Sequence, residues 1–211
     1  APLPAIQPPG AGSTGSFLRL LHDTYNDSFN SVAFRQTAPG LFQTIVADFD
    51  FRMANSANNP ADGWAFMLIP TKTYGTNGPG VNTQPQGIEE PNFPGVFSVG
   101  VDVYPHGTQN DVSVHWNAGE KVNVTMPRPA YELVNNQFHH MKVTLQHVPG
   151  GARVTVTLMF NINGIPSAPY TPIDNLFVAG LDPYDCRVQF AARMGDGTEH
   201  LHRARLERGR L

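Results

Sequence analysis

Apolar and polar residues alternate with a period of two through much of this chain. Residues 42–53 are the clearest early case, because one face collects the large apolar side chains: Ile45, Ala47, Phe49, Phe51 and Met53. Alternation of this kind is typical of a β-strand that buries one face. The pattern therefore predicts a strand here, with its apolar face in a core.

Two pairs of alternating segments are separated by turn residues. Residues 99–104 and 112–116 flank a Pro-His-Gly break, and residues 138–148 and 154–160 flank Pro-Gly-Gly. Each arrangement predicts a β-hairpin.

The remaining segments are short. Residues 64–69 form an apolar run that predicts a strand buried on both faces, and residues 176–181 predict one helical turn or a short strand. Residues 70–94 have almost no periodicity and predict a long surface loop. About eleven or twelve strands at this spacing are typical of an all-β sandwich or barrel.

Composition supports one domain without long helices. The 211 residues include 20 Gly and 19 Pro spread along the chain, which cut it into short pieces. Residues 1–16 are mostly Pro, Gly, Ser and Thr and predict a flexible arm or linker, so the domain is expected to span residues 17–211.

Charge and cysteine usage exclude several classes of protein. The net charge of −3 argues against nucleic acid as a partner, and no apolar run reaches membrane-spanning length. The single Cys186 excludes an internal disulfide and a cysteine-based zinc site. One cysteine fits a secreted or cell-surface protein, although a cytosolic protein would look the same.

Candidate chemistry centres on the first hairpin. Asp102 lies near the end of its first strand, and Asn110 and Asp111 follow the break. Oxygen donors placed in this way suit a hard cation or the hydroxyl groups of a sugar.

Three separated segments resemble the concanavalin A-like, legume-type lectin superfamily. Residues 61–68 (ADGWAFML) resemble the family's A-D-G-x-A-F segment, and residues 99–104 (VGVDVY) resemble its V-E-F-D-T-Y/F strand. Residues 187–200, from RVQFAAR onward, resemble the closing strand pair of its bacterial and animal members. The resemblance implies a jelly-roll sandwich of two antiparallel sheets, with sugar bound beside a structural calcium ion.

The resemblance also implies a sugar site. Asp62 takes the place of the family's sugar-binding aspartate, with Gly63 after it, and we expect Tyr104, His106 and Asn110 to complete the site. An ionised carboxylate accepts strong hydrogen bonds from hydroxyl groups, which suits that role. The alternative is that Asp62 only fills a turn before a strand.

The implied calcium ligands are Asp102, the backbone carbonyl of Tyr104, Asn110 and Asp111. The chain departs from the family pattern twice: Gly100 replaces a metal-binding glutamate, and His106 replaces an asparagine that serves calcium and sugar. Imidazole is a poor calcium ligand, so three alternatives are open: a degenerate site, one shifted onto Asn110, or an empty one.

Other candidates are weighed in the same way. His115 lies near the family's metal histidine, but without the glutamate we expect a structural strand histidine. The aromatic candidates for stacking on a sugar are Trp64, Tyr74, Phe93, Tyr104 and Trp116. Trp64 is expected in the core, whereas Tyr74, Phe93 and Tyr104 lie on or next to loops and are the better candidates.

Catalysis is not expected. Retaining glycosidases of this fold need two carboxylates on one strand face, and the corresponding strand offers Asp102 alone. Glu89 and Glu90 are adjacent and are interpreted as solvated loop charges.

The sequence therefore predicts a non-catalytic, carbohydrate-binding module with a glycan or polysaccharide partner, possible calcium dependence and a place in a larger multidomain chain. A structural or adhesive interaction domain without sugar binding is the first alternative, and a polysaccharide-cleaving enzyme is the second.

Overall fold

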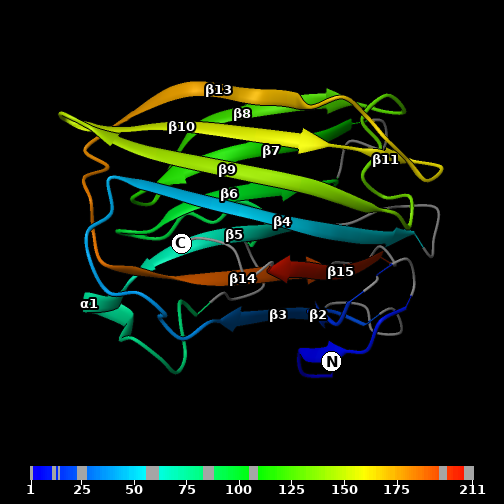
Figure 1. Cartoon of the computed structure of the whole chain (residues 1–211), viewed down its shortest axis with the longest axis horizontal. Coiled ribbons are helices and arrows are strands. Elements are labelled where there is room, and N and C mark those ends of the chain that lie inside the picture. Colours follow the sequence, from blue (N-terminus) through cyan, green and yellow to red (C-terminus); the bar gives the residue numbers. More distant parts are fainter. Residues whose placement is uncertain are drawn as a thin grey trace.

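Two antiparallel sheets lie face to face in the computed structural model, which describes residues 2–10, 13, 15–22, 28–55, 62–82, 88–104, 109–194 and 199–206 (Figure 1). The seven-stranded sheet has the order β1 (Ala5–Gln7), β2 (Phe17–Arg19), β15 (Glu199–Leu206), β4 (Thr44–Asn55), β9 (Phe138–Val148), β10 (Gly151–Met159) and β13 (Tyr170–Ala179). The six-stranded sheet has the order β3 (Ser28–Ala33), β14 (Cys186–Met194), β5 (Gly63–Pro70), β6 (Phe97–Asp102), β7 (Gln109–Trp116) and β8 (Gly119–Pro127). A small hairpin of β11 (Asn161–Ile162) and β12 (Ile165–Pro166) and the helical turn α1 (Thr71–Tyr74) complete the described elements. The predicted all-β, two-sheet sandwich is confirmed.

The core between the sheets follows the predicted alternation. Phe49 and Phe51 of β4 are buried as the period-two pattern requires. The Phe49 ring lies 5.8 Å from Trp64 of β5 and 5.1 Å from Phe190 of β14, measured between ring centroids. Edge-on aromatic contacts of this kind join the two sheets.

Both predicted hairpins are present. β6 pairs with β7 and β9 pairs with β10, each in antiparallel register. Residues 176–181, left open between a helical turn and a strand, contribute their first four residues to β13.

The outer face of the six-stranded sheet is covered rather than open. Val81, Ile88 and Val96 are buried in a second apolar cluster against Ala65 and Met67 of β5. The prediction of a surface loop over residues 70–94 is therefore wrong for Val81 and for residues 88–91, which pack on the sheet, whereas residues 71–80 are mostly exposed. Periodicity did not reveal this contact, since the loop has no repeat of its own.

Two side chains of β14 hold this covering segment in place. The buried Arg187 guanidinium donates hydrogen bonds to the backbone carbonyls of Phe34, Tyr74, Gly78 and Pro79. Gln189 bonds Val81 twice: its Oε1 accepts from the Val81 N–H and its Nε2 donates to the Val81 carbonyl. Because every one of these bonds except that to Phe34 uses a backbone group of the loop, the loop has a defined position over the sheet.

Part of the expected N-terminal arm joins the sheet. Residues 5–7 form β1, which pairs with β2 at the edge of the seven-stranded sheet. Residues 5–7 of the arm are therefore paired in a sheet, while its flexibility and the boundary at residues 16 and 17 stay predictions. Among the described residues, no helix has the length and apolar character needed to cross a membrane.

Candidate functional site

A row of charged residues crosses one end of the six-stranded sheet on its outer face. The register pairs Arg193 of β14 with Gly63 of β5, Gly63 with Asp102 of β6, and Asp102 with Asp111 of β7. We call Asp62, Asp102, Asp111 and Arg193 the carboxylate row. Asp62 belongs to it because its carbonyl accepts a 2.8 Å hydrogen bond from the Val103 N–H. The two aspartates implied by the resemblance therefore lie side by side.

Asp62 is held by an arginine. Its Oδ2 lies 2.9 Å from Arg193 Nε, and the residue is only 5% exposed. Arg193 Nη1 also lies 3.1 Å from Glu89 Oε1, so one guanidinium serves two carboxylates. This arrangement fixes the direction of the Asp62 carboxylate, which is a requirement for selective recognition of a hydroxyl group.

Asp102 lies in an acidic environment. Its pKa is raised to about 7, chiefly by burial; a hydrogen bond from the Tyr104 N–H at 2.7 Å acts to lower it, and the nearby Glu89, Glu90 and Asp111 act to raise it. A proton or a bound cation would stabilise a carboxylate in this position, because either one neutralises its unfavourable negative charge. The donors are all oxygen atoms, which is the set that calcium prefers.

The other predicted site residues divide between two faces. Tyr104 is 42% exposed and follows Asp102 directly at the rim, and Gly63 lies in the row itself. Asn110 lies on the core-facing side of β7, with Val112 and Val114, and is fully buried. Its Oδ1 accepts a 2.9 Å hydrogen bond from Arg128 and its Nδ2 donates to the Tyr131 carbonyl. The structure does not bring the Asn110 side chain together with Asp102 and Asp111, and His106 lies outside the described residues.

Glu89 and Glu90 were interpreted as solvated loop charges, and this is wrong for Glu89. Its residue exposure is 9%, and burial raises the pKa of its carboxyl group. A Cβ atom at Gly63 would come within 2.8 Å of the Glu89 Cβ. Because glycine has no side chain, the loop that carries Glu89 can lie against β5 here. Glu89 and Arg193 are thus parts of the site that the sequence did not indicate; the glycine in the strand is the only signal of a close approach.

The candidate aromatic residues also divide. Trp64 is buried in the core as expected, and Trp116 stacks on Tyr184 with 5.7 Å between ring centroids. Tyr74 and Phe93 pack against the second apolar cluster. Tyr104 is therefore the candidate ring that the structure leaves most accessible beside the carboxylate row.

Comparison with known proteins adds the fold class. No family model and no curated protein sequence matches this chain at a significant level. Among solved structures, lectin II from Ulex europaeus is 16% identical, with a TM-score of 0.62 over 96% of this chain and 88% of that chain. A lectin from Bauhinia forficata in complex with GalNAc is 14% identical, with a TM-score of 0.63 over 96% of this chain and 89% of that chain. The exoplasmic/lumenal domain of VIP36, in its Ca²⁺/Man3GlcNAc-bound form, is 16% identical, with a TM-score of 0.61 over all of this chain and 86% of that chain.

These likenesses show the fold: the chain has the legume-type, concanavalin A-like lectin sandwich. At such low identity the roles of individual residues are not carried across, so the sugar and calcium ligands stay predictions.

Proposed function

We propose that this protein is a non-catalytic lectin that binds a glycan at the carboxylate row. The observation that carries the proposal is the register across three strands, in which Gly63, Asp102 and Asp111 are successive neighbours and Asp62 is bonded to the next residue of β6. The lectin fold supports it, since the neighbours named above are lectins. A row of fixed carboxylates at the end of a sheet suits polar, neutral ligands that are rich in hydroxyl groups.

Recognition would use hydrogen bonds from sugar hydroxyls to Asp62. Arg193 orients this carboxylate through their ion pair, so the acceptor atoms do not need to be ordered when the sugar binds. The exposed ring of Tyr104 offers an apolar surface against the C–H face of a pyranose. Both groups lie at the same end of the sheet, because Asp62 precedes β5 and Tyr104 follows β6.

Calcium fits the same end of the sheet. Asp102 and Asp111 are directly opposite each other in the register, and a bound cation would offset the charge repulsion that raises the pKa of Asp102. The backbone carbonyl of Tyr104 is a further oxygen donor in our proposal. A calcium ion there would neutralise the two carboxylates and order the residues that carry them.

We extend the proposal to location and partners. The VIP36 domain is described as exoplasmic or lumenal, and the low cysteine usage of this chain, with Cys186 alone, fits a secreted protein. We therefore propose a secreted or cell-surface protein whose partner is a glycan, as a free oligosaccharide or as part of a polysaccharide. A second candidate is an adhesive interaction domain without sugar binding, and the observation that favours it is the engagement of Asn110 by Arg128.

A glycan array probed with the fluorescently labelled chain tests the proposal. We expect binding in calcium buffer, loss of binding in a calcium chelator and recovery when calcium is added back. Binding that persists in the chelator would remove calcium from the proposal and leave the lectin function standing. Absence of binding to every glycan would favour the adhesive domain, and release of reducing ends from polysaccharides would show an enzyme.

A further inference from the structure

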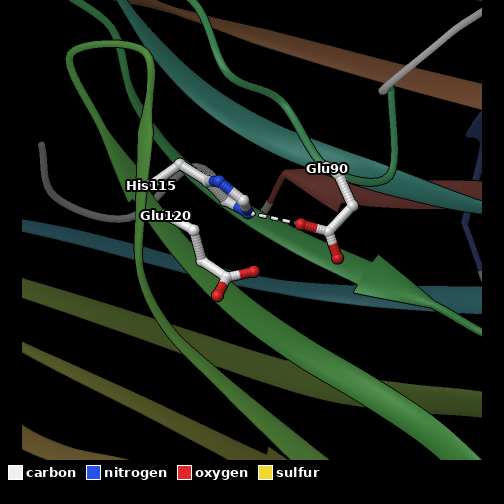
Figure 2. A group of neighbouring side chains, drawn as sticks. All are labelled: Glu90, His115 and Glu120. Atoms are coloured by element: carbon white, nitrogen blue, oxygen red, sulfur yellow. Dashed lines mark ion pairs between the residues drawn. The ribbon is translucent and has the colours of Figure 1, made fainter.

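Three side chains converge on the outer face of the six-stranded sheet, away from the carboxylate row. They are His115 of β7, Glu120 of β8 and Glu90 of the covering loop (Figure 2). One nitrogen or oxygen atom of each lies within 4.8 Å of the others, and His115 Nε2 is 3.1 Å from Glu90 Oε2. His115 follows Asp111 by four residues on the same strand, which separates the two sites by about 13 Å.

A hydrogen bond to Asn92 fixes the orientation of the His115 imidazole. Its Nδ1 lies 2.9 Å from Asn92 Oδ1, so Nδ1 carries the proton and donates to that carbonyl oxygen. Nε2 then presents its lone pair to Ser113 Oγ at 2.8 Å, which donates to it, and to Glu90 Oε2. The 3.1 Å contact between Nε2 and the Glu90 carboxylate needs a positive charge, which either a proton on Nε2 or a bound metal ion supplies. Histidine ligands of metals commonly have this arrangement, with the second ring nitrogen bonded to a carbonyl oxygen.

A β-bulge selects the residue that faces His115. Val114 pairs with Val122, but His115 pairs with Glu120, so Lys121 is the extra residue of β8. In an unbroken register Lys121 would lie opposite His115. Bulges re-aim side chains next to functional sites, and this one replaces a cation with a carboxylate.

The covering loop is fixed where it carries Glu90. A Cβ atom at Gly100 would collide with the backbone carbonyl of Glu89, so only glycine lets the loop lie this close to β6. Ser98 Oγ donates a 2.9 Å hydrogen bond to the Pro91 carbonyl one residue beyond Glu90. The carboxylate of Glu90 is therefore delivered to His115 by backbone contacts on both sides of it.

The cluster lacks a balancing cation. Among the described residues, neither Glu90 nor Glu120 forms an ion pair with lysine or arginine, and besides His115 the Glu90 carboxylate has Asn123 Nδ2 at 3.5 Å. One ligand atom from each of the two carboxylates and from the fully buried imidazole lies within 4.8 Å of the others, a spacing that a single divalent ion can bridge.

We propose that Glu90, His115 and Glu120 bind a divalent transition-metal ion, with zinc as the best match. One imidazole nitrogen and two carboxylate oxygens are common zinc ligands, and three protein ligands leave a position for water or another donor. Calcium suits this cluster poorly because it disfavours nitrogen ligands. The proposal is independent of glycan binding, since it uses none of the residues of the carboxylate row.

Isothermal titration of the metal-stripped full chain with zinc chloride tests the proposal, in excess calcium so that oxygen-only sites are occupied. We expect one zinc ion per chain, and affinity reduced ~10-fold or more in Glu120→Gln and in Glu90→Gln. Lys121→Gln is the matched control, because Lys121 is next to Glu120 but is the unpaired residue of the bulge. This variant should bind zinc as the wild type does.

Cobalt substitution gives a second readout that does not depend on heat signals. A visible absorption band of bound Co²⁺ should appear with the wild type and with Lys121→Gln, and should be lost in Glu90→Gln/Glu120→Gln. Circular dichroism should be the same for all variants, since Glu120 is exposed. Absence of zinc binding, or binding unchanged in the double variant, would overturn the proposal.

Discussion

The two faces of the six-stranded sheet are built on different principles. Its inner face presents large apolar side chains such as Trp64, Phe66 and Phe190 to the opposite sheet. Its outer face carries glycine, serine and charged residues beside a smaller apolar cluster. A loop without periodicity covers it through that cluster and through hydrogen bonds from Arg187 and Gln189. The comparison teaches that most of the stability comes from the inner face, whereas the candidate binding groups lie on the outer face. The covering loop brings Glu89 and Glu90 to that outer face.

The inner face should give the largest effect on stability. Phe49 of β4, in the opposite sheet, packs on this face, and Phe49→Ala removes a fully buried ring that contacts Trp64, Phe66 and Phe190. We expect it to lower the free energy of unfolding by about 3–5 kcal/mol. Urea denaturation followed by fluorescence measures the change. A loss similar to that of a surface substitution would contradict the contrast between the faces.

The core also predicts a pH dependence. Burial lowers the pKa of His139 to about 4 from 6.5. Its Nε2 donates to the Leu133 carbonyl and its Nδ1 accepts from the Asn161 N–H, so the neutral ring is the form that fits. Between pH 6.5 and pH 4 the unfolded chain binds a proton at His139 that the folded protein does not bind. The stability that depends on the neutral His139 ring is therefore complete above pH 6.5 and is lost as the pH falls toward 4. The loss amounts to about 3 kcal/mol.

His139→Gln isolates this contribution, because glutamine keeps a donor and an acceptor and does not titrate. Asp102 acts with the opposite sign, since its raised pKa favours the folded state as the pH falls from about 7. The measured quantity is therefore the difference in unfolding free energy between the wild type and His139→Gln, followed from pH 7 to pH 4 without calcium. A difference that does not change with pH would show that His139 is not the titrating group.

The outer face should respond less in stability and more in chemistry. Gly100→Ala drives a Cβ atom into the Glu89 carbonyl, and we expect a displaced loop at a cost of about 1–3 kcal/mol. Gly15→Ala is the matched control, because a Cβ there meets nothing within 4 Å. Hydrogen exchange of residues 88–96 should rise in Gly100→Ala alone; equal exchange in both variants would show that the loop does not depend on this contact.

Much of the inner face could be predicted from the sequence. Period-two alternation places Phe49, Phe51 and the two hairpins correctly, because burial of one strand face imposes that pattern. The adjacency of Asp62 and Asp102 followed from the family resemblance rather than from the pattern.

The outer face could not be predicted to the same extent. The burial of Glu89 and its pairing with Arg193 arise from a loop that folds back onto the sheet, and no local pattern encodes such a contact. Asn110 is different, since its alternation with Val112 and Val114 already indicates a core-facing side chain. The prediction of Asn110 as a ligand is wrong for its side chain, because the residue belongs to the core-facing side of β7 and not to the loop.

The central claim is that a glycan is bound at the carboxylate row. Its most direct test is the affinity of Asp62→Asn for the strongest ligand of the array, beside Asp48→Asn, a change on the outer face of the opposite sheet. Loss of the charge-assisted hydrogen bonds should weaken binding by about 10- to 100-fold in Asp62→Asn and leave Asp48→Asn equal to the wild type. Wild-type affinity in a folded Asp62→Asn protein would place the glycan elsewhere and contradict the account.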